Sequence, residues 1–92
     1  MSKKNLKLSK KFKALGDENR LKILCVIFAK KKICVSEIAK ELKISVAIVS
    51  HHLKALEKVG IVSPLRTGKN VCYLLLKNSF ASDLRRLVCK YK

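Results

Sequence analysis

The sequence predicts a small, mainly α-helical domain with one β-hairpin near its carboxyl end. Three observations indicate this fold class. Apolar residues recur at helical spacing through most of the chain up to Gly60. Two short runs rich in branched residues, 61–66 and 71–76, then flank a Thr-Gly-Lys-Asn turn. A last segment from Asn78 returns to helical spacing, so the expected order is α-α-α-α-β-β-α in a single domain spanning residues 1–92.

Apolar stripes and end signals predict the first two helices. The first helix ends at Gly16, and its apolar residues are Leu6, Leu8, Phe12 and Leu15. The second runs from Asp17, whose carboxylate can accept from free N–H groups of the first turn, to about Lys31. Its inward stripe is expected to consist of Leu21, Leu24, Ile27 and Phe28, widened by Ile23.

Two helices joined by a tight turn follow. Residues 33–35 form a short extended crossing, and a third helix covers roughly 35–42. Residues 43–44 make the turn, and Ser45 caps a fourth helix that ends at Gly60, since glycine readily takes the left-handed conformation that closes a helix. Such a pair is a helix-turn-helix, whose second member reads the major groove of DNA.

The fourth helix has one apolar face and one face suited to DNA. The inward face is formed by Val49, Leu53, Leu56 and Val59. The opposite face carries small, hydrogen-bonding or cationic side chains that can approach base edges and phosphates, namely Val46, Ala47, Ser50, His51 and Lys54. Ser50 and His51 can hydrogen-bond to base edges, whereas Val46 and Ala47 can touch a thymine methyl group.

The hairpin after the fourth helix is predicted to be a wing. Pro64 cannot donate to a strand ladder, so the first strand is an edge strand or is bulged. Arg66, Lys69 and Asn70 gather near the tip, within reach of phosphates or of an adjacent minor groove. A solvated turn is the alternative interpretation of a basic tip. With the wing, the fold class becomes a winged helix-turn-helix.

The last helix, capped by Asn78 or Ser79, has an amphipathic stripe with two possible uses. The stripe consists of Phe80, Leu84, Leu87, Val88 and Tyr91. It can form a dimer interface together with the first helix, or it can complete the core of the monomer.

The charge of the chain favours a polyanionic partner. The 22 Lys and Arg residues against 6 Asp and Glu residues give a net charge of +16, which suits nucleic acid or an anionic membrane surface. A solvated lysine-rich surface is the plainer alternative.

No apolar run reaches the roughly 18 residues of a membrane span, and no signal peptide is evident, so we expect a cytoplasmic protein. Phosphate-binding glycine loops, paired carboxylates and nucleophilic triads are missing from the sequence, so neither an enzyme nor a cofactor is expected.

Four stretches of the sequence together resemble the ArsR family of winged helix-turn-helix repressors. They are KALGDENRLKIL at 13–24, SEIAKELKIS at 36–45, VSHHLKALEKVGIV at 49–62 and RTGKNVCYLL at 66–75. The resemblance implies a homodimer that binds a double-stranded DNA operator of imperfect inverted repeats and is released by an inducer. A metal-responsive repressor of the same type and a sequence-nonspecific basic nucleic-acid-binding protein are the alternatives.

The resemblance also assigns DNA-contacting residues. The positions that the family uses for bases are Val46, Ala47, Ser50 and His51, and those matching backbone contacts are Ser45, His52, Lys54, Arg66, Lys69 and Asn70. His52 can instead lie inward beside Leu53 as a structural residue. His51 and His52 are not expected to share a metal, because adjacent helical side chains point about 100° apart.

The four cysteines bear on the inducer. They lack CxxC spacing, which argues against a zinc ribbon and against a disulfide scaffold. The family's metal sensors carry a C-V-C motif at the third helix, where this chain has Cys34-Val35-Ser36, and no histidine accompanies Asp83 on the last helix. No metal site is therefore assigned.

A thiol switch is the favoured interpretation. Cys25 on the second helix and Cys89 on the last are similar in layout to the ArsR branch that cross-links one cysteine from each of these helices, although Cys89 lies about one turn early. Simple packing of these thiols is the alternative. Cys34 stands three residues before Glu37, at a helix start where a thiol pKa tends to be lowered, and is a second reactive candidate. Cys72 is predicted to be ordinary packing in the wing.

Overall fold

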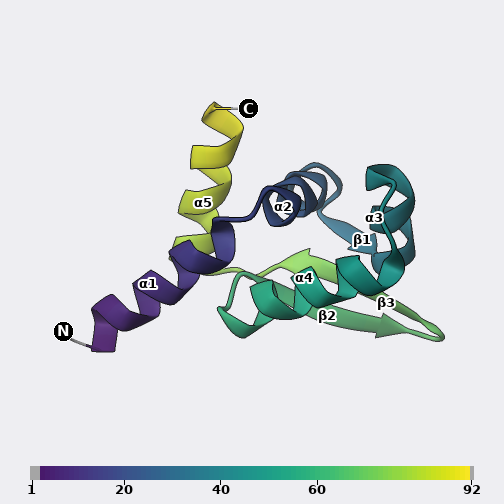
Figure 1. The fold of residues 1–92 in the computed structure, drawn as a ribbon, viewed down its shortest axis with the longest axis horizontal. Helices are drawn as coiled ribbons and strands as arrows, with labels where there is room; N and C mark the ends of the chain where they lie inside the picture. Colours follow the sequence, from purple (N-terminus) through teal and green to yellow (C-terminus); the bar gives the residue numbers. More distant parts are fainter. Residues whose placement is uncertain (1–2, 92) are drawn as a thin grey trace.

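The computed structural model describes residues 3–91, with side chains from Lys7 onward. The elements follow in the order α1 (Lys3–Leu15), α2 (Glu18–Lys30), β1 (Lys32–Cys34), α3 (Val35–Leu42), α4 (Val46–Lys58), β2 (Val62–Thr67), β3 (Asn70–Leu75) and α5 (Ser79–Lys90) (Figure 1). Within these described residues, no helix is long and apolar enough to cross a membrane. The predicted helices and hairpin are confirmed, and one further strand is present.

Helices α2, α4 and α5 begin at polar caps in the predicted places. Asp17 accepts from the backbone N–H of the third residue beyond it at 3.1 Å, and Ser45 does the same at the start of α4, also at 3.1 Å. Asn78, the first of the two candidates for α5, accepts at 2.8 Å. At the other end of α4, Gly60 has φ +79°, the left-handed conformation that its lack of a Cβ permits.

The strands form one antiparallel sheet in the order β1-β3-β2. The extended crossing expected at 33–35 forms a short strand, β1, which pairs with β3 and places Ile33 opposite Tyr73. A three-residue strand is too short for its alternation to reveal a partner, and this partner lies far along the sequence. Pro64 lies in the edge strand β2, as predicted.

The core lies between α2, α4 and the sheet. Ile23, Leu24 and Ile27 of α2 have no exposed surface, and they share one cluster with the three fully buried residues of α4, Val49, Leu53 and Leu56. Val59 is only partly buried. This packing holds α4 by its apolar face and turns its other face outward.

Helices α1 and α5 project from the end of the domain opposite the hairpin tip (Figure 1). Their aromatic rings meet, since the centroids of Phe12 and Phe80 lie 6.4 Å apart. The stripe of α5 divides: Leu84 is buried, whereas Leu87 is 54% exposed and Tyr91 76% exposed. Part of the stripe therefore completes the monomer core, and its outer part is open.

Leu21 was expected to face the core, but it is 38% exposed because it lies at the margin of the apolar face of α2. The side chain of Leu6 lies outside the described residues.

Candidate nucleic-acid interface

The outward face of α4 is the first part of the candidate interface. Ser45 and Lys54 are exposed, as are most of the residues predicted to face bases; Val46 is 52% exposed, and Ser50 is half-buried. Ile48, which the sequence reasoning did not single out, is also 46% exposed on the first turn of the helix. Short side chains at the start of this face allow the helix backbone to come close to a groove of DNA, and a cationic side chain follows farther along the helix.

A groove of about 650 Å³ separates α4 from the hairpin. Its lining residues are Val35, Ser50, Lys54, Glu57, Lys58, Pro64, Arg66, Val71 and Tyr73. Three of these residues are cationic and one is acidic, so the groove suits a phosphate backbone in charge.

Tyr73 ties the wing to the recognition helix inside this groove. Its hydroxyl donates to Glu57 Oε1 at 3.3 Å. Burial and the neighbouring Glu57 carboxylate raise the pKa of Tyr73, so the hydroxyl stays protonated and remains a donor. The sequence did not predict this pair, because Tyr73 and Glu57 lie 16 residues apart and no sequence pattern indicates that they meet.

The tip of the wing is a further part of the candidate interface, beside the outward face of α4 and the groove. Arg66, Lys69 and Asn70 are all exposed there. The hairpin is tighter than predicted, because Thr67 pairs with Asn70 and Gly68, with φ +60°, starts the two-residue turn. The tip lies at the same end of the domain as α3 and the first turn of α4 (Figure 1).

His52 lies apart from the other predicted contacts. Its side chain is buried, with 9% exposed, and Nδ1 accepts from Arg20 Nε at 3.1 Å. Burial lowers the pKa of His52, opposed by Asp17 and assisted by Arg20 and His51. Of the two roles left open for His52, this geometry favours the structural one. The ring joins α4 to α2, and the Arg20 guanidinium continues the link to Ala14 of α1, donating to its carbonyl at 3.3 Å.

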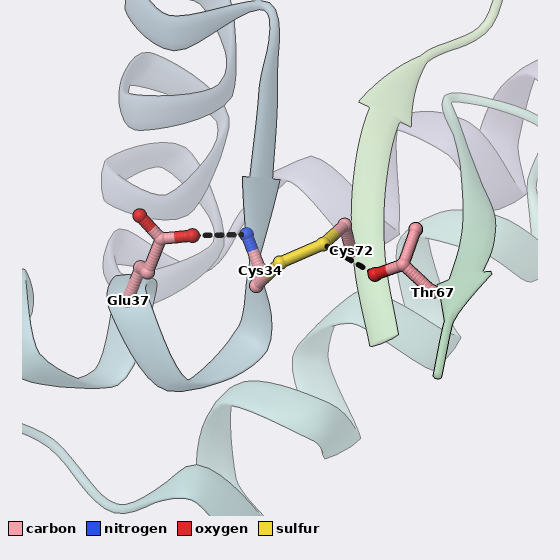
Figure 2. Close-up of a disulfide and its surroundings, with 4 residues drawn as sticks. All are labelled: Cys34, Glu37, Thr67 and Cys72. Atoms are coloured by element: carbon pink, nitrogen blue, oxygen red, sulfur yellow. Dashed lines mark hydrogen bonds between the residues drawn. A yellow bond between two sulfur atoms is a disulfide. The ribbon is translucent and has the colours of Figure 1, made fainter. Parts of the chain in front are cut away.

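The cysteines are arranged differently from the prediction. Cys34 and Cys72 lie opposite each other in the β1–β3 ladder and form a disulfide (Figure 2). The prediction of ordinary packing for Cys72 is therefore wrong, because it was made without knowing that β1 pairs with β3. Cys25, half-buried on α2, and Cys89, exposed on α5, are free thiols rather than a bonded pair.

Glu37 satisfies a free backbone N–H at the start of α3. The backbone N–H of Cys34 donates to Glu37 Oε1 at 3.2 Å, which is one half of a capping box. No group of three or more His, Cys, Asp or Glu side chains gathers as a metal site in residues 3–91.

An outward-facing second helix, a tight turn before it and a basic hairpin after it define a winged helix-turn-helix DNA-binding protein. A family model described as "Bacterial regulatory protein, arsR family" matches residues 17–63, from the cap of α2 into β2. The chain belongs to the ArsR family of bacterial transcriptional regulators.

Relatives of known name agree with this assignment. The chain is 42% identical over 81 residues to the cadmium resistance transcriptional regulatory protein CadC of Listeria innocua, covering 88% of this chain and 67% of that protein. It is 30% identical to the transcriptional activator HlyU of Vibrio cholerae, covering 98% of this chain and 85% of HlyU.

Solved structures share the fold. HlyU from Vibrio cholerae has a TM-score of 0.87 and 27% identity, covering 99% of this chain and 97% of that one. A structure described as reduced HlyU has a TM-score of 0.85, with 27% identity and coverage of 97% and 92%. A Mycobacterium bovis domain described as homodimeric has a TM-score of 0.82 at 24% identity, covering 99% of this chain and 86% of that domain, and shows the fold alone.

Proposed function

We propose that the protein is a homodimeric, sequence-specific repressor that is released from its operator by thiol chemistry. The observation that carries the DNA-binding part is the joint surface of α4 and the wing. The polar face of α4, the cationic groove beside it and the basic tip lie together, and α2 holds α4 in this orientation through a buried core. A surface of this kind reads bases from the helix and is held in register by phosphates.

The residues of this surface take two roles. Base edges are read from the start and middle of α4, by Val46, Ala47, Ser50 and His51. Phosphates are contacted by Ser45, Lys54, Arg66, Lys69 and Asn70. His52 supports these contacts from behind by fixing α4 against α2 through Arg20.

Two copies associate through α1 and α5. Exposed apolar side chains gather at this end of the domain, with Leu8 43%, Phe12 58%, Leu87 54% and Tyr91 76% exposed. Covering them with the same surface of a second copy removes this apolar area from water. The two α4 helices then face successive major grooves, about 34–36 Å apart on an inverted repeat.

Thiol chemistry is the proposed inducer because the chain can form a disulfide and also keeps two free thiols. The description of one HlyU structure as reduced is consistent with redox forms in that relative. The competing inducer is a soft metal ion, favoured by the resemblance to a cadmium resistance regulator. The relative HlyU is described as a transcriptional activator, whereas we propose that this chain represses transcription.

The experiment compares a duplex selected from a random pool with an unrelated duplex at fixed salt. We expect the selected duplex to bind about 10³-fold more tightly or better. His51→Ala should weaken the selected duplex by about 1–3 kcal/mol and leave the unrelated duplex unchanged. Lys69→Ala should weaken both alike and reduce the salt slope by about one. Equal affinities for the two duplexes would contradict sequence-specific binding.

Repression and the inducer are tested with a reporter under the selected operator. We expect low expression with the protein present and a rise after hydrogen peroxide. Higher expression in the presence of the protein would instead indicate an activator. Release by Cd²⁺ but not by peroxide would favour the metal alternative.

A further inference from the structure

We infer that Cys34 and Cys72 are a reversible oxidation site for hydroperoxides, and that the bond between them controls the groove between α4 and the wing. The inference rests on the proposed function of that groove in DNA binding. It concerns a cysteine pair different from the one on α2 and α5.

The fold places these two thiols to react with each other. Cys34 ends β1 and precedes α3, while Cys72 lies opposite it in β3 (Figure 2). Directly opposed residues of an antiparallel pair have Cβ atoms about 4.5–5.5 Å apart, close to the separation that a disulfide requires. The bond can therefore form and break with small movements of the strands.

The two thiols differ in access. Cys34 is half-buried, whereas Cys72 is 2% exposed. A small oxidant in solution can reach Cys34 directly, and Cys72 reacts only with a partner already inside the sheet. Cys34 is thus the attacking residue and Cys72 the resolving residue.

The chemistry balances with a hydroperoxide as oxidant. The Cys34 thiolate attacks the terminal peroxide oxygen, the O–O bond breaks, and the products are a sulfenic acid on Cys34 and an alcohol, or water from hydrogen peroxide. The Cys72 thiol then attacks the Cys34 sulfur, the S–O bond breaks, water leaves and the disulfide forms. Two electrons pass from the thiols to the peroxide, and a dithiol reductant reverses the step by exchange.

The pair lies directly behind the proposed DNA-binding groove. Val35 follows Cys34 and Val71 precedes Cys72, and both valines line the groove beside α4. Thr67 Oγ1, at the end of β2, lies 3.8 Å from Cys72 Sγ. Because close-packed interiors transmit small displacements, making or breaking this bond shifts the groove lining and the wing.

The bond also ties the wing covalently to the start of the helix that precedes α4. It connects β3 of the wing to the start of α3, and α3 leads through a tight turn, with Lys43 in the left-handed conformation, into α4. Docking requires α4 and the wing to settle in their grooves together. Fixing β3 to α3 removes the freedom for that adjustment, so oxidation weakens operator binding.

The test uses the full chain with Cys25→Ala and Cys89→Ala, so that only the proposed pair can react. After hydrogen peroxide we expect a Cys34–Cys72 peptide link by mass spectrometry and operator affinity lower by about tenfold or more, restored by dithiothreitol. Cys34→Ser should abolish the response and still fold, because serine is a good helix cap. Cys72→Ala is the second variant, and thermal melting checks that it folds.

Three results would overturn the inference. They are absence of the link, unchanged affinity of the linked protein, and a response that persists in Cys34→Ser. Hydrogen exchange of β2 and β3 without DNA gives an independent measurement. We expect faster exchange in β2 and β3 after reduction. Equal exchange rates in the reduced and oxidised proteins would count against control of the wing by this bond. If the reduced protein binds its operator no more tightly than an unrelated duplex, the proposed function is refuted. The Cys34–Cys72 link and the hydrogen-exchange rates would still test the oxidation site independently.

Discussion

Asn78 is the residue whose replacement tests most directly how α5 is attached to the DNA-reading part of the domain. Its Oδ1 accepts from the backbone N–H of Ala81 at 2.8 Å, which caps α5. Its Nδ2 donates to the carbonyl of Gly60 at 3.0 Å, in the turn after α4. One side chain thus closes the helix proposed for dimerisation and ties it to the end of the recognition helix.

The cost of Asn78→Ala follows from these two bonds. Loss of a helix cap costs about 1 kcal/mol. The bond to Gly60 is exposed, so its contribution lies at the low end for a neutral hydrogen bond, about 0.5 kcal/mol. The sum is about 1.5 kcal/mol, which for a domain of this size lowers the melting temperature by roughly 6–12 °C.

The assay is urea unfolding followed by circular dichroism at one fixed protein concentration, because dimerisation makes stability depend on concentration. Asn78→Ser is the matched variant: it keeps a capping oxygen and is too short to reach Gly60, so it should lose only about 0.5 kcal/mol. If serine destabilises the fold as much as alanine does, the cap does not contribute as argued. If neither variant changes stability, both bonds are without energetic weight.

Two further predictions concern α4. Lowering the pH from about 8 to about 5 should destabilise the fold: the pKa of His52 is lowered in the folded state, so its contribution is present above the unfolded value of 6.5 and is lost as the pH falls through the folded pKa. His52→Asn should remove that part of the pH slope in urea unfolding, and an unchanged slope would exclude His52 as its source. Tyr73→Phe should weaken operator binding about two- to tenfold in fluorescence anisotropy by removing the hydrogen bond to Glu57. An operator affinity that Tyr73→Phe leaves unchanged would contradict the argument.

The local features of the fold were predictable from sequence because their causes are local. A cap such as Ser45 acts within one turn, and the buried stripe through Leu53 follows from helical periodicity. The end of α4 at Gly60 follows from the conformational freedom of glycine. The exposed face of α4 was predictable for the same reason, since it is the complement of the buried stripe.

Contacts between distant segments were not predictable in this way. The Arg20–His52 bond joins α2 to α4, and the hydroxyl of Tyr73 reaches Glu57 only because β3 lies beside α4. Neither pair has a spacing that marks it in the sequence. The sequence therefore left the role of His52 open, whereas its burial and its bond to Arg20 favour a structural role.

The pairing of β1 with β3 has the largest consequence for function. Without it, Cys34 is a thiol at a helix start and Cys72 a packing residue, and attention falls on Cys25 and Cys89. With it, two cysteines meet behind the groove that we propose for DNA, while the free thiols lie on helices away from that groove. A switch acts most directly where its bond joins the wing to the segment that leads into α4. By this criterion the β1–β3 pair is better placed than Cys25 and Cys89 to couple oxidation to DNA release.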